Sequence, residues 1–299
     1  MNGEIKYRKS FSGVLADVII WSVVIIMTLA CLLPLLNTVA ISFSNQAAAT
    51  GNLVWLLPVG FNISSYVKIL EDTQFWRSFG ISVTRVVLGT SINLSLIVLL
   101  AYPLSKNNRE FHHRNIYMWA VMIAMLFSGG TIPLFTVVKK LGLTNSILAL
   151  ILPGAVSVYN VILMMNFFKA VPKSLEEAAT IDGASIWQVL FKVFLPISKP
   201  AIATIALFSI VGHWNDYFSG LIYINSAVKY PLQTYIQQLT IDFSEMYSTD
   251  PEMLEELSKL SNRAMNSAKI VVSTVPLLLI YPWLQRYFVT GIVVGAVKE

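Results

Sequence analysis

The sequence has 299 residues, of which 56% are hydrophobic and only 12% are charged, with a formal net charge of +5 at pH 7. Soluble domains carry about a quarter charged residues, so this composition excludes a water-soluble globule and a disordered chain. The apolar residues lie in solid runs of about 20 residues or more, the length that a transmembrane helix needs. Solid runs also argue against a membrane β-barrel, whose strands alternate in polarity.

We predict an all-α membrane protein with six transmembrane helices in one domain that covers residues 1–299. The predicted spans are residues 17–43, 78–105, 116–138, 148–168, 200–224 and 270–288. Lys6, Arg8 and Lys9 before the first span resemble the basic head of a signal peptide. However, the apolar part of a signal has about 7 to 15 residues, so this longer run is expected to be a retained helix.

Two loops between spans contain signals for short helices. Ser64 or Ser65 precedes a helical pattern after the first span and is a candidate N-cap. In the loop of residues 225–269, Asp250-Pro251 is typical of a helix start, and leucines follow at helical spacing. We expect this amphipathic helix to lie outside the membrane, packed on its own loops or on a partner.

Ionisable residues occur in two of the predicted spans. Arg85 lies in the second span and Asp216 in the fifth, where Trp214 and Asn215 precede it. These four residues are candidates for a polar path through the membrane, lined by an aromatic ring and hydrogen-bonding groups. The alternative is that Arg85 and Asp216 only bond helices together, which is the commoner use of buried polar groups. The three histidines lack metal-ligand spacing, and we predict no metal site.

Residues 169–199, between the fourth and fifth spans, form a loop that is too long for a simple turn. Ser174 and Glu177 have capping-box spacing for a first helix. Asp182-Gly183 ends that helix, because glycine tolerates the left-handed conformation found at helix ends.

A second helix is predicted from residue 185 to residue 194, with Leu195-Pro196 as its break. Two short helices with a sharp bend form a compact knob on the membrane surface. Such a knob is either a docking site or a cap over the helix bundle.

Charge predicts the orientation, because the side with more lysine and arginine is normally cytoplasmic. With the N-terminus inside, twelve of these residues lie in the cytoplasm and eight lie outside. We therefore expect both termini to be cytoplasmic and the knob to face the cytoplasm. The net positive charge is then a topology signal, and no nucleic-acid partner is predicted.

The knob matches a fixed pattern of residues. Glu177-Ala178-Ala179 is followed after three residues by Gly183 and, after nine more, by Val193-Phe194-Leu195-Pro196. This resembles the EAA loop of ATP-binding-cassette (ABC) importer permeases, with valine in place of isoleucine at position 193. Segments 101–105, 212–216 and 281–288 extend the resemblance to the carbohydrate-uptake, maltose-type permeases, and within them to oligosaccharide permeases that work with a lipoprotein binding protein.

The resemblance implies a type I importer permease in a bacterial plasma membrane, surrounded by lipid. Its implied partners are a second homologous permease, two copies of an ABC ATPase and an extracellular solute-binding protein, and its implied substrate is a carbohydrate. A non-sugar solute is the alternative substrate. The chain has no Gly-Lys dipeptide and hence no P-loop, so ATP and Mg are expected to bind to the partner ATPase and this chain is expected not to be an enzyme.

The resemblance also implies roles for single residues. The ATPase-coupling residues are Glu177, Ala178, Ala179, Asp182, Gly183, Leu195 and Pro196. Glu177 would contact basic or polar groups of the ATPase, and the two alanines would allow close docking. Gly183 would supply the bend and Pro196 the angle to the fifth span. The tail of residues 290–299 would reach between the ATPases.

Two rival classes fit less well. An intramembrane enzyme would need clustered histidine, aspartate or serine on facing helices, and the sequence shows no such cluster. A secondary carrier would usually show two related halves or several intramembrane acids. Neither class explains the knob.

Overall fold

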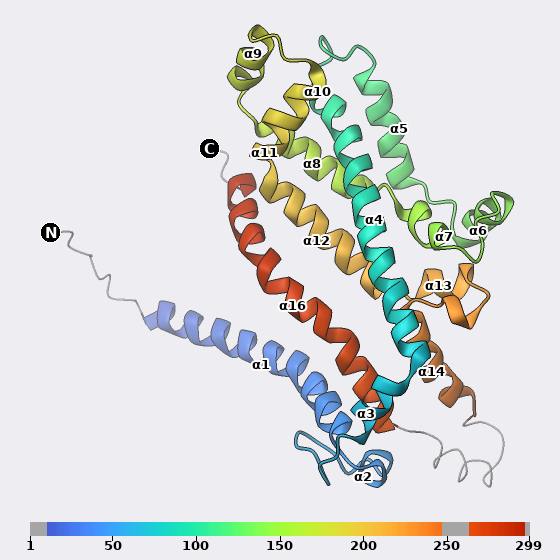
Figure 1. Ribbon diagram of the computed structural model, residues 1–299. Coiled ribbons are helices and arrows are strands. Elements are labelled where there is room, and N and C mark those ends of the chain that lie inside the picture. The colour runs from blue at the N-terminus through green and yellow to red at the C-terminus, as the bar shows by residue number, and fades with distance from the viewer. Residues whose placement is uncertain (1–10, 247–262, 297–299) are drawn as a thin grey trace. The chain divides into compact units, whose positions relative to one another are not determined.

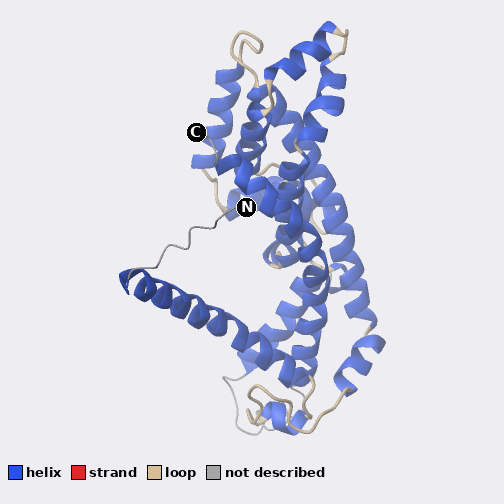
Figure 2. Ribbon diagram, turned by 90° about the vertical axis from the view of Figure 1, so that its left-hand side faces the viewer, coloured by secondary structure: helices blue, strands red, loops and turns tan. Residues whose placement is uncertain are grey.

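The computed structural model describes residues 11–246 and 263–296. Within these ranges every regular element is a helix, and no strand is present (Figures 1 and 2). The chain forms two compact units, which are described separately. Unit 1 contains residues 1–71 and 243–272, and unit 2 contains residues 72–242 and 273–299. The helix predicted after Asp250-Pro251 lies outside the described residues.

Unit 1 is built around the end of the first long helix. Its helices are α1 (Phe11–Ser42), α2 (Gln46–Thr50) and α3 (Ser64–Glu71), together with the first turns of α16 (Arg263–Ala296). A small apolar cluster joins them, and it consists of Ala40, Ile41, Ala48, Ala49, Val54 and Ala264. The helix predicted after Ser64 or Ser65 is present as α3, but the predicted cap is wrong: the Asn62 side chain accepts a hydrogen bond from the Ser64 amide.

Unit 2 contains the remaining described helices. In chain order they are α4 (Thr73–Ser105), α5 (Arg114–Leu126), α6 (Thr131–Lys140), α7 (Ile147–Ile151), η1 (Leu152–Gly154), α8 (Val158–Ala170), α9 (Lys173–Ile181), α10 (Ile186–Val189), the π-helix η2 (Leu190–Phe194), α11 (Leu195–Ile197), α12 (Lys199–Asn215), α13 (Phe218–Tyr223), η3 (Ala227–Lys229) and most of α14 (Leu232–Met246), followed by α16 from residue 273. The π-turn precedes Pro196, which has no amide hydrogen to donate to the preceding turn.

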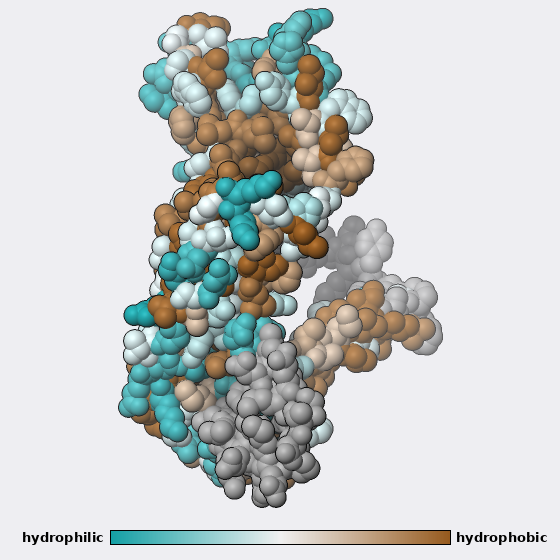
Figure 3. Space-filling model, turned by 90° about the vertical axis from the view of Figure 1, so that its right-hand side faces the viewer, coloured by the Kyte–Doolittle hydropathy of each residue, from teal (hydrophilic) through white to brown (hydrophobic). Residues whose placement is uncertain are grey.

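Three described helices are long and apolar enough to cross a membrane without a break, over Asp17–Ser42, Thr73–Ser105 and Arg263–Pro282. Three bent helix pairs raise the number of candidate spans to as many as six, and the third pair joins residues 186–197 of the knob to α12 at 81°. The helical class and a total of up to six spans agree with the fold predicted from the sequence. The part of α1 that is visible in Figure 3 carries mainly apolar side chains.

The bent pairs differ from uninterrupted spans for local reasons. The helices over residues 114–126 and 131–140 meet at 115°, because Gly130 between them has φ +82°. The helices over residues 147–154 and 158–170 meet at 55°, next to Pro153. The predicted span of residues 200–224 is interrupted because α12 ends at Asn215 and Asp216 is extended, with ψ 101°.

The core of unit 2 holds α4, α8 and α12 against the knob. Its buried side chains come from these helices and from α10 and η2, and they include Ile97, Ala101, Met164, Phe168, Leu190, Phe194 and Ile205. Tyr102 meets Phe168 and Phe194 edge-on, with ring centroids 6.0 and 5.2 Å apart. The knob is therefore built onto the transmembrane core through apolar contacts.

Candidate functional site: a polar cavity and a coupling knob

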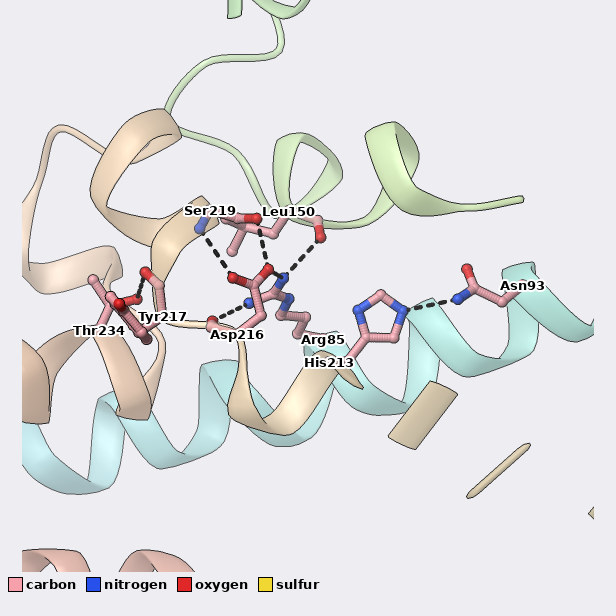
Figure 4. A network of polar contacts seen from close by, with 8 residues as sticks. All are labelled: Arg85, Asn93, Leu150, His213, Asp216, Tyr217, Ser219 and Thr234. Carbon is pink, nitrogen blue, oxygen red and sulfur yellow. Dashed lines mark hydrogen bonds and ion pairs between the residues drawn. The ribbon is translucent and has the colours of Figure 1, made fainter. Parts of the chain in front are cut away.

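A buried arginine joins three segments of unit 2 (Figure 4). Arg85 of α4 is 1% exposed and forms an ion pair with the Asp216 carboxylate. Its guanidinium also donates to the backbone oxygen of Asp216, at 2.8 Å, and to that of Leu150, at 3.1 Å. These oxygens lie at the C-terminal ends of α12 and α7, where unpaired carbonyls carry partial negative charge. The guanidinium therefore ties two helix ends to α4.

Asp216 in turn starts the next helix. Its carboxylate accepts hydrogen bonds from the Ser219 amide at 3.1 Å and from the Ser219 hydroxyl at 2.6 Å. These bonds satisfy free donors in the first turn of α13, as a capping residue does. One carboxylate thus neutralises Arg85 and fixes the chain after α12.

A row of polar groups continues from this ion pair along α4 and α12. The surroundings of Asn93 orient its amide so that the nitrogen donates to the carbonyls of Gly89, at 3.0 Å, and Ala155, at 3.2 Å. The amide oxygen then accepts from Ser209 Oγ, at 3.0 Å, and from His213 Nε2, at 3.2 Å. This arrangement assigns the proton of His213 to Nε2.

Gly89 lacks a side chain where the helices approach closely. A Cβ at this position would overlap the His213 ring, whereas a Cβ at Gly80 of the same helix would meet no atom within 4 Å. Glycine at position 89 therefore makes room for the imidazole beside α4.

The polar row opens into a cavity of about 540 Å³ within unit 2. Its polar and aromatic lining residues are Arg85, Asn93, Ser157, Tyr159, Asn160, Phe208, Ser209, His213, Asp216 and Ser219. Because Arg85 and Asp216 form an ion pair, these two residues add no net charge to this lining. Hydroxyl, amide and imidazole groups beside exposed aromatic rings can hydrogen-bond and stack against a polyhydroxylated ring.

The structure separates the four residues predicted for the translocation path. Arg85 and Asp216 pair and line the cavity, whereas Trp214 and Asn215 are not among its lining residues. Trp214 is buried, and its indole nitrogen donates to the Ser273 carbonyl at 3.1 Å. The path itself stays a prediction for all four residues.

The sequence prediction did not include Asn93, Ser209 or His213. A signal for them exists, because Asn93 follows Arg85 by eight residues and Asp216 follows Ser209 by seven and His213 by three. At 3.6 residues per turn these spacings place the polar residues of each span on one helix face.

The knob of residues 173–197 has the predicted two-helix form with a different first cap. Ser174 is the second residue of α9, which begins at Lys173 after Pro172, so the predicted capping box of Ser174 and Glu177 is wrong. The helix ends at Asp182, and Gly183 has φ +79° as predicted for the bend. A capping box does occur at the second helix, between Ser185 and Gln188.

The predicted break at Leu195-Pro196 is displaced. Helical structure continues through Pro196 to residue 197, and the 81° turn into α12 occurs at Ser198. A π-turn before the proline lets the chain pass it, because Leu195 donates to the Leu190 carbonyl five residues back.

The coupling residues predicted from the EAA pattern divide between the surface and the core. Glu177, Ala178, Asp182, Gly183 and Pro196 are exposed. Ala179 and Leu195 instead pack against the core of unit 2. The sequence pattern therefore combines exposed positions, for which docking stays a prediction, with positions that hold the knob on the membrane helices.

The knob also presents unpartnered apolar side chains. Ile181, Ile186, Trp187 and Phe191 are 86%, 71%, 60% and 57% exposed. The rings of Trp187 and Phe191 stack with centroids 6.3 Å apart. A contiguous exposed group of this kind is typical of a surface that binds another protein or a membrane.

Comparisons with known proteins identify the family. Residues 111–294 match the model of the family described as "Binding-protein-dependent transport system inner membrane component". The chain belongs to this family. It is a multi-pass inner-membrane permease subunit of an ABC importer, as the knob pattern led us to expect.

Two Bacillus subtilis (strain 168) proteins are similar to this permease over most of their length. The polygalacturonan/rhamnogalacturonan transport system permease protein YtcP is 39% identical, with 95% of this chain and 98% of YtcP covered. Protein LplC is 40% identical, with 89% of each chain covered.

A solved structure supports the fold. A chain of a bacterial ABC transporter involved in the import of the acidic polysaccharide alginate matches with a TM-score of 0.84 and 33% identity. The match covers 95% of this permease and all of that chain. The fold is therefore that of an ABC importer permease.

Proposed function

We propose that this permease moves an oligosaccharide from an extracellular solute-binding protein into the cytoplasm, in a heterodimer with a second homologous permease. The main observation in support of this proposal is the knob, because its exposed apolar residues and its EAA-pattern residues suit the cleft of an ATPase. The names of similar proteins support the substrate class, since YtcP is described as a polygalacturonan/rhamnogalacturonan permease and the matching transporter imports alginate. A carbohydrate is thus favoured over a non-sugar solute.

Two copies of an ABC ATPase would supply the energy, with ATP and Mg bound in those subunits and not in this chain. The absence of a Gly-Lys dipeptide from the sequence supports this division. Glu177, Ala178, Asp182 and Gly183 would contact the ATPase, together with Pro196. Ala179 and Leu195 would transmit the movement into the core that they pack against.

The orientation follows from the same docking. The knob must face the cytoplasm, where ATP is available, and the excess of lysine and arginine predicts the same side. Both termini would then be cytoplasmic.

The cavity is the proposed polar part of the translocation path. Arg85 would act through its position, since its charge is neutralised by Asp216 and two helix-end carbonyls. Tyr159, Asn160 and His213 line the cavity and would contact the sugar. A neutral lining of hydroxyl and amide groups suits a hydroxyl-rich substrate that has to be bound and then released during transport.

The test is ATP-dependent uptake into proteoliposomes that contain both permeases, the ATPase and the binding protein. Labelled oligogalacturonides, neutral oligosaccharides and a non-sugar osmolyte would be supplied in parallel, with a hydrolysis-deficient ATPase as control. We expect uptake of an oligosaccharide that stops with the control ATPase. Uptake of the osmolyte alone would overturn the substrate class, and uptake with the inactive ATPase would overturn the mechanism.

A further inference from the structure

An irregular segment of unit 1 presents large apolar side chains that the described residues of unit 1 leave exposed. We call residues 51–63, between α2 and α3, the apolar loop. Leu53, Trp55, Leu57 and Phe61 in this loop are 70%, 77%, 78% and 70% exposed. Loops of soluble surfaces are normally polar, so four such side chains within nine positions require an apolar surrounding.

The apolar loop is held in a defined conformation by bonds to the end of α1. The Val59 amide donates to Ser44 Oγ at 3.0 Å, and the Val59 carbonyl accepts from the Asn45 amide at 3.1 Å. Two residues after Val59, the ring of Phe61 stacks on Phe43 with centroids 5.7 Å apart. The exposed side chains are thus displayed by a fixed backbone.

Asn37 of α1 fixes the position of the loop along the axis of that helix. Its amide nitrogen donates to the carbonyls of Val54, at 3.1 Å, and Trp55, at 2.6 Å. The loop therefore runs back beside the last turns of α1 instead of extending away from its end. Asn37 follows Asp17 by twenty residues, which is about 30 Å of helix and matches the thickness of the hydrocarbon core.

The distribution of charged residues agrees with a loop placed at the boundary of the hydrocarbon core. No Asp, Glu, Lys, Arg or His occurs between Asp17 and Lys68, so the loop continues the uncharged stretch of the first span. The described part of that span, Asp17–Ser42, is 0% buried in its most apolar window. The nearest described charge is Arg263, which donates to Asn52 at the start of the loop, so the stretch of residues 53–61 with the four large apolar side chains carries no charge itself.

We propose that the apolar loop is a membrane-interface anchor: Leu53, Trp55, Leu57 and Phe61 insert at the boundary between phospholipid headgroups and acyl chains, in the leaflet at the C-terminal end of α1. Tryptophan and other aromatic residues favour this boundary, where a ring is buried while its polar edge reaches water. The loop fixes how deeply α1 sits, because its backbone is bonded to Asn37.

The experiment uses spin labels on the full-length permease in its complete importer, reconstituted in phosphatidylglycerol–phosphatidylethanolamine vesicles. Cys31 is the only cysteine and would be replaced by alanine. Single labels would then be placed with Trp55→Cys, Leu57→Cys and, as matched control in the first charged position after the loop, Lys68→Cys. Collision with oxygen reports lipid, and collision with a water-soluble nickel chelate reports water.

We expect labels at positions 55 and 57 to collide more with oxygen and less with nickel than the label at position 68. Nickel exposure equal to that at position 68 would show a loop in water and overturn the proposal. Exclusion of both reagents would show a loop covered by protein and would also overturn it. Leu53→Cys provides a third position if one labelled variant does not assemble, and uptake by each variant checks that the importer is intact.

Discussion

Lys106 and Glu176 form an ion pair that joins the end of α4 to the first part of α9. The Lys106 ammonium also lies 4.4 Å from the ring centroids of both Tyr102 and Phe194. One cation thus contacts the long transmembrane helix, the first knob helix and the π-turn that precedes Pro196. A force on the knob reaches α4 through this side chain as well as through the apolar core.

Lys106→Met should weaken this link while keeping the length of the side chain. The ion pair is partly buried, with side-chain exposures of 14% for Lys106 and 31% for Glu176. We therefore expect the substitution to lower the free energy of unfolding by about 1 kcal/mol, in the range measured for exposed ion pairs and cation–π contacts. In proteoliposomes the variant should hydrolyse ATP but import less substrate per ATP. Lys173→Met, an exposed lysine in α9, is the control. An unchanged ratio of uptake to hydrolysis would refute this coupling role.

Loss of the buried charge pair should reduce stability strongly. Asp216→Asn leaves the Arg85 guanidinium buried without a counter-charge, which costs about 3 kcal/mol in comparable sites. We expect a lower Tm of the purified complex in detergent, and a larger drop for Arg85→Met because two helix-end carbonyls then lose their donor as well. Arg77→Met, at an exposed position of the same helix, should leave Tm nearly unchanged. Equal Tm values for all three would contradict the assigned role.

Gly89→Ala should destabilise the pairing of α4 with α12. The new Cβ would overlap the His213 ring, and overpacking of this kind costs about 1–3 kcal/mol. Gly80→Ala in the same helix meets no atom within 4 Å and should be neutral or stabilising, since alanine is the better helix former. Thermal unfolding of both variants measures the contrast. Equal stability of the two would show that α4 and α12 can separate at no cost.

Trp187→Ala should reduce binding of the ATPase without unfolding the permease. The side chain is 60% exposed and stacks only on Phe191 within the knob, so its loss removes docking surface. We expect less ATPase to copurify, with an unchanged Tm of the permease. Trp119→Ala, a tryptophan of similar exposure outside the knob, is the control. If the two variants retained equal amounts of ATPase, the docking surface would have to lie elsewhere.

Composition and periodicity predicted the helical class and six spans because apolar runs depend only on local sequence. The bends were not predicted, since Gly130 and Asp216 break helices through backbone angles that a hydropathy pattern does not report. The knob was predicted better, because Asp182-Gly183 is a strong local stop signal. The capping box predicted for the first helix at Ser174 does not occur, because α9 begins after Pro172, whereas the second helix, predicted to start at Ser185, does have a capping box with Gln188.

The cavity could not be predicted from the sequence, because its lining depends on which helices face each other in the fold. Arg85 and Asp216 could be singled out from their charge alone. Asn93 and His213 could not be assigned to one another until α4 and α12 were placed side by side. Trp214 shows the reverse error: it lies two residues before Asp216 in the sequence, but its indole nitrogen donates to a different neighbour, Ser273.

The hydrogen bond from Arg85 to the backbone oxygen of Leu150 affects which positions of the sequence can change during evolution. Leu150 contributes only its backbone oxygen, which every amino acid possesses. The bond to Arg85 therefore does not depend on which side chain position 150 carries, and the size of the leucine side chain is set instead by its packing in the apolar cluster of Val138, Ala149, Tyr223 and Ile224. The hydrogen bonds of this junction therefore constrain only two side chains, those at positions 85 and 216. The third group is the backbone oxygen of residue 150, and a comparison of amino-acid sequences would not reveal it.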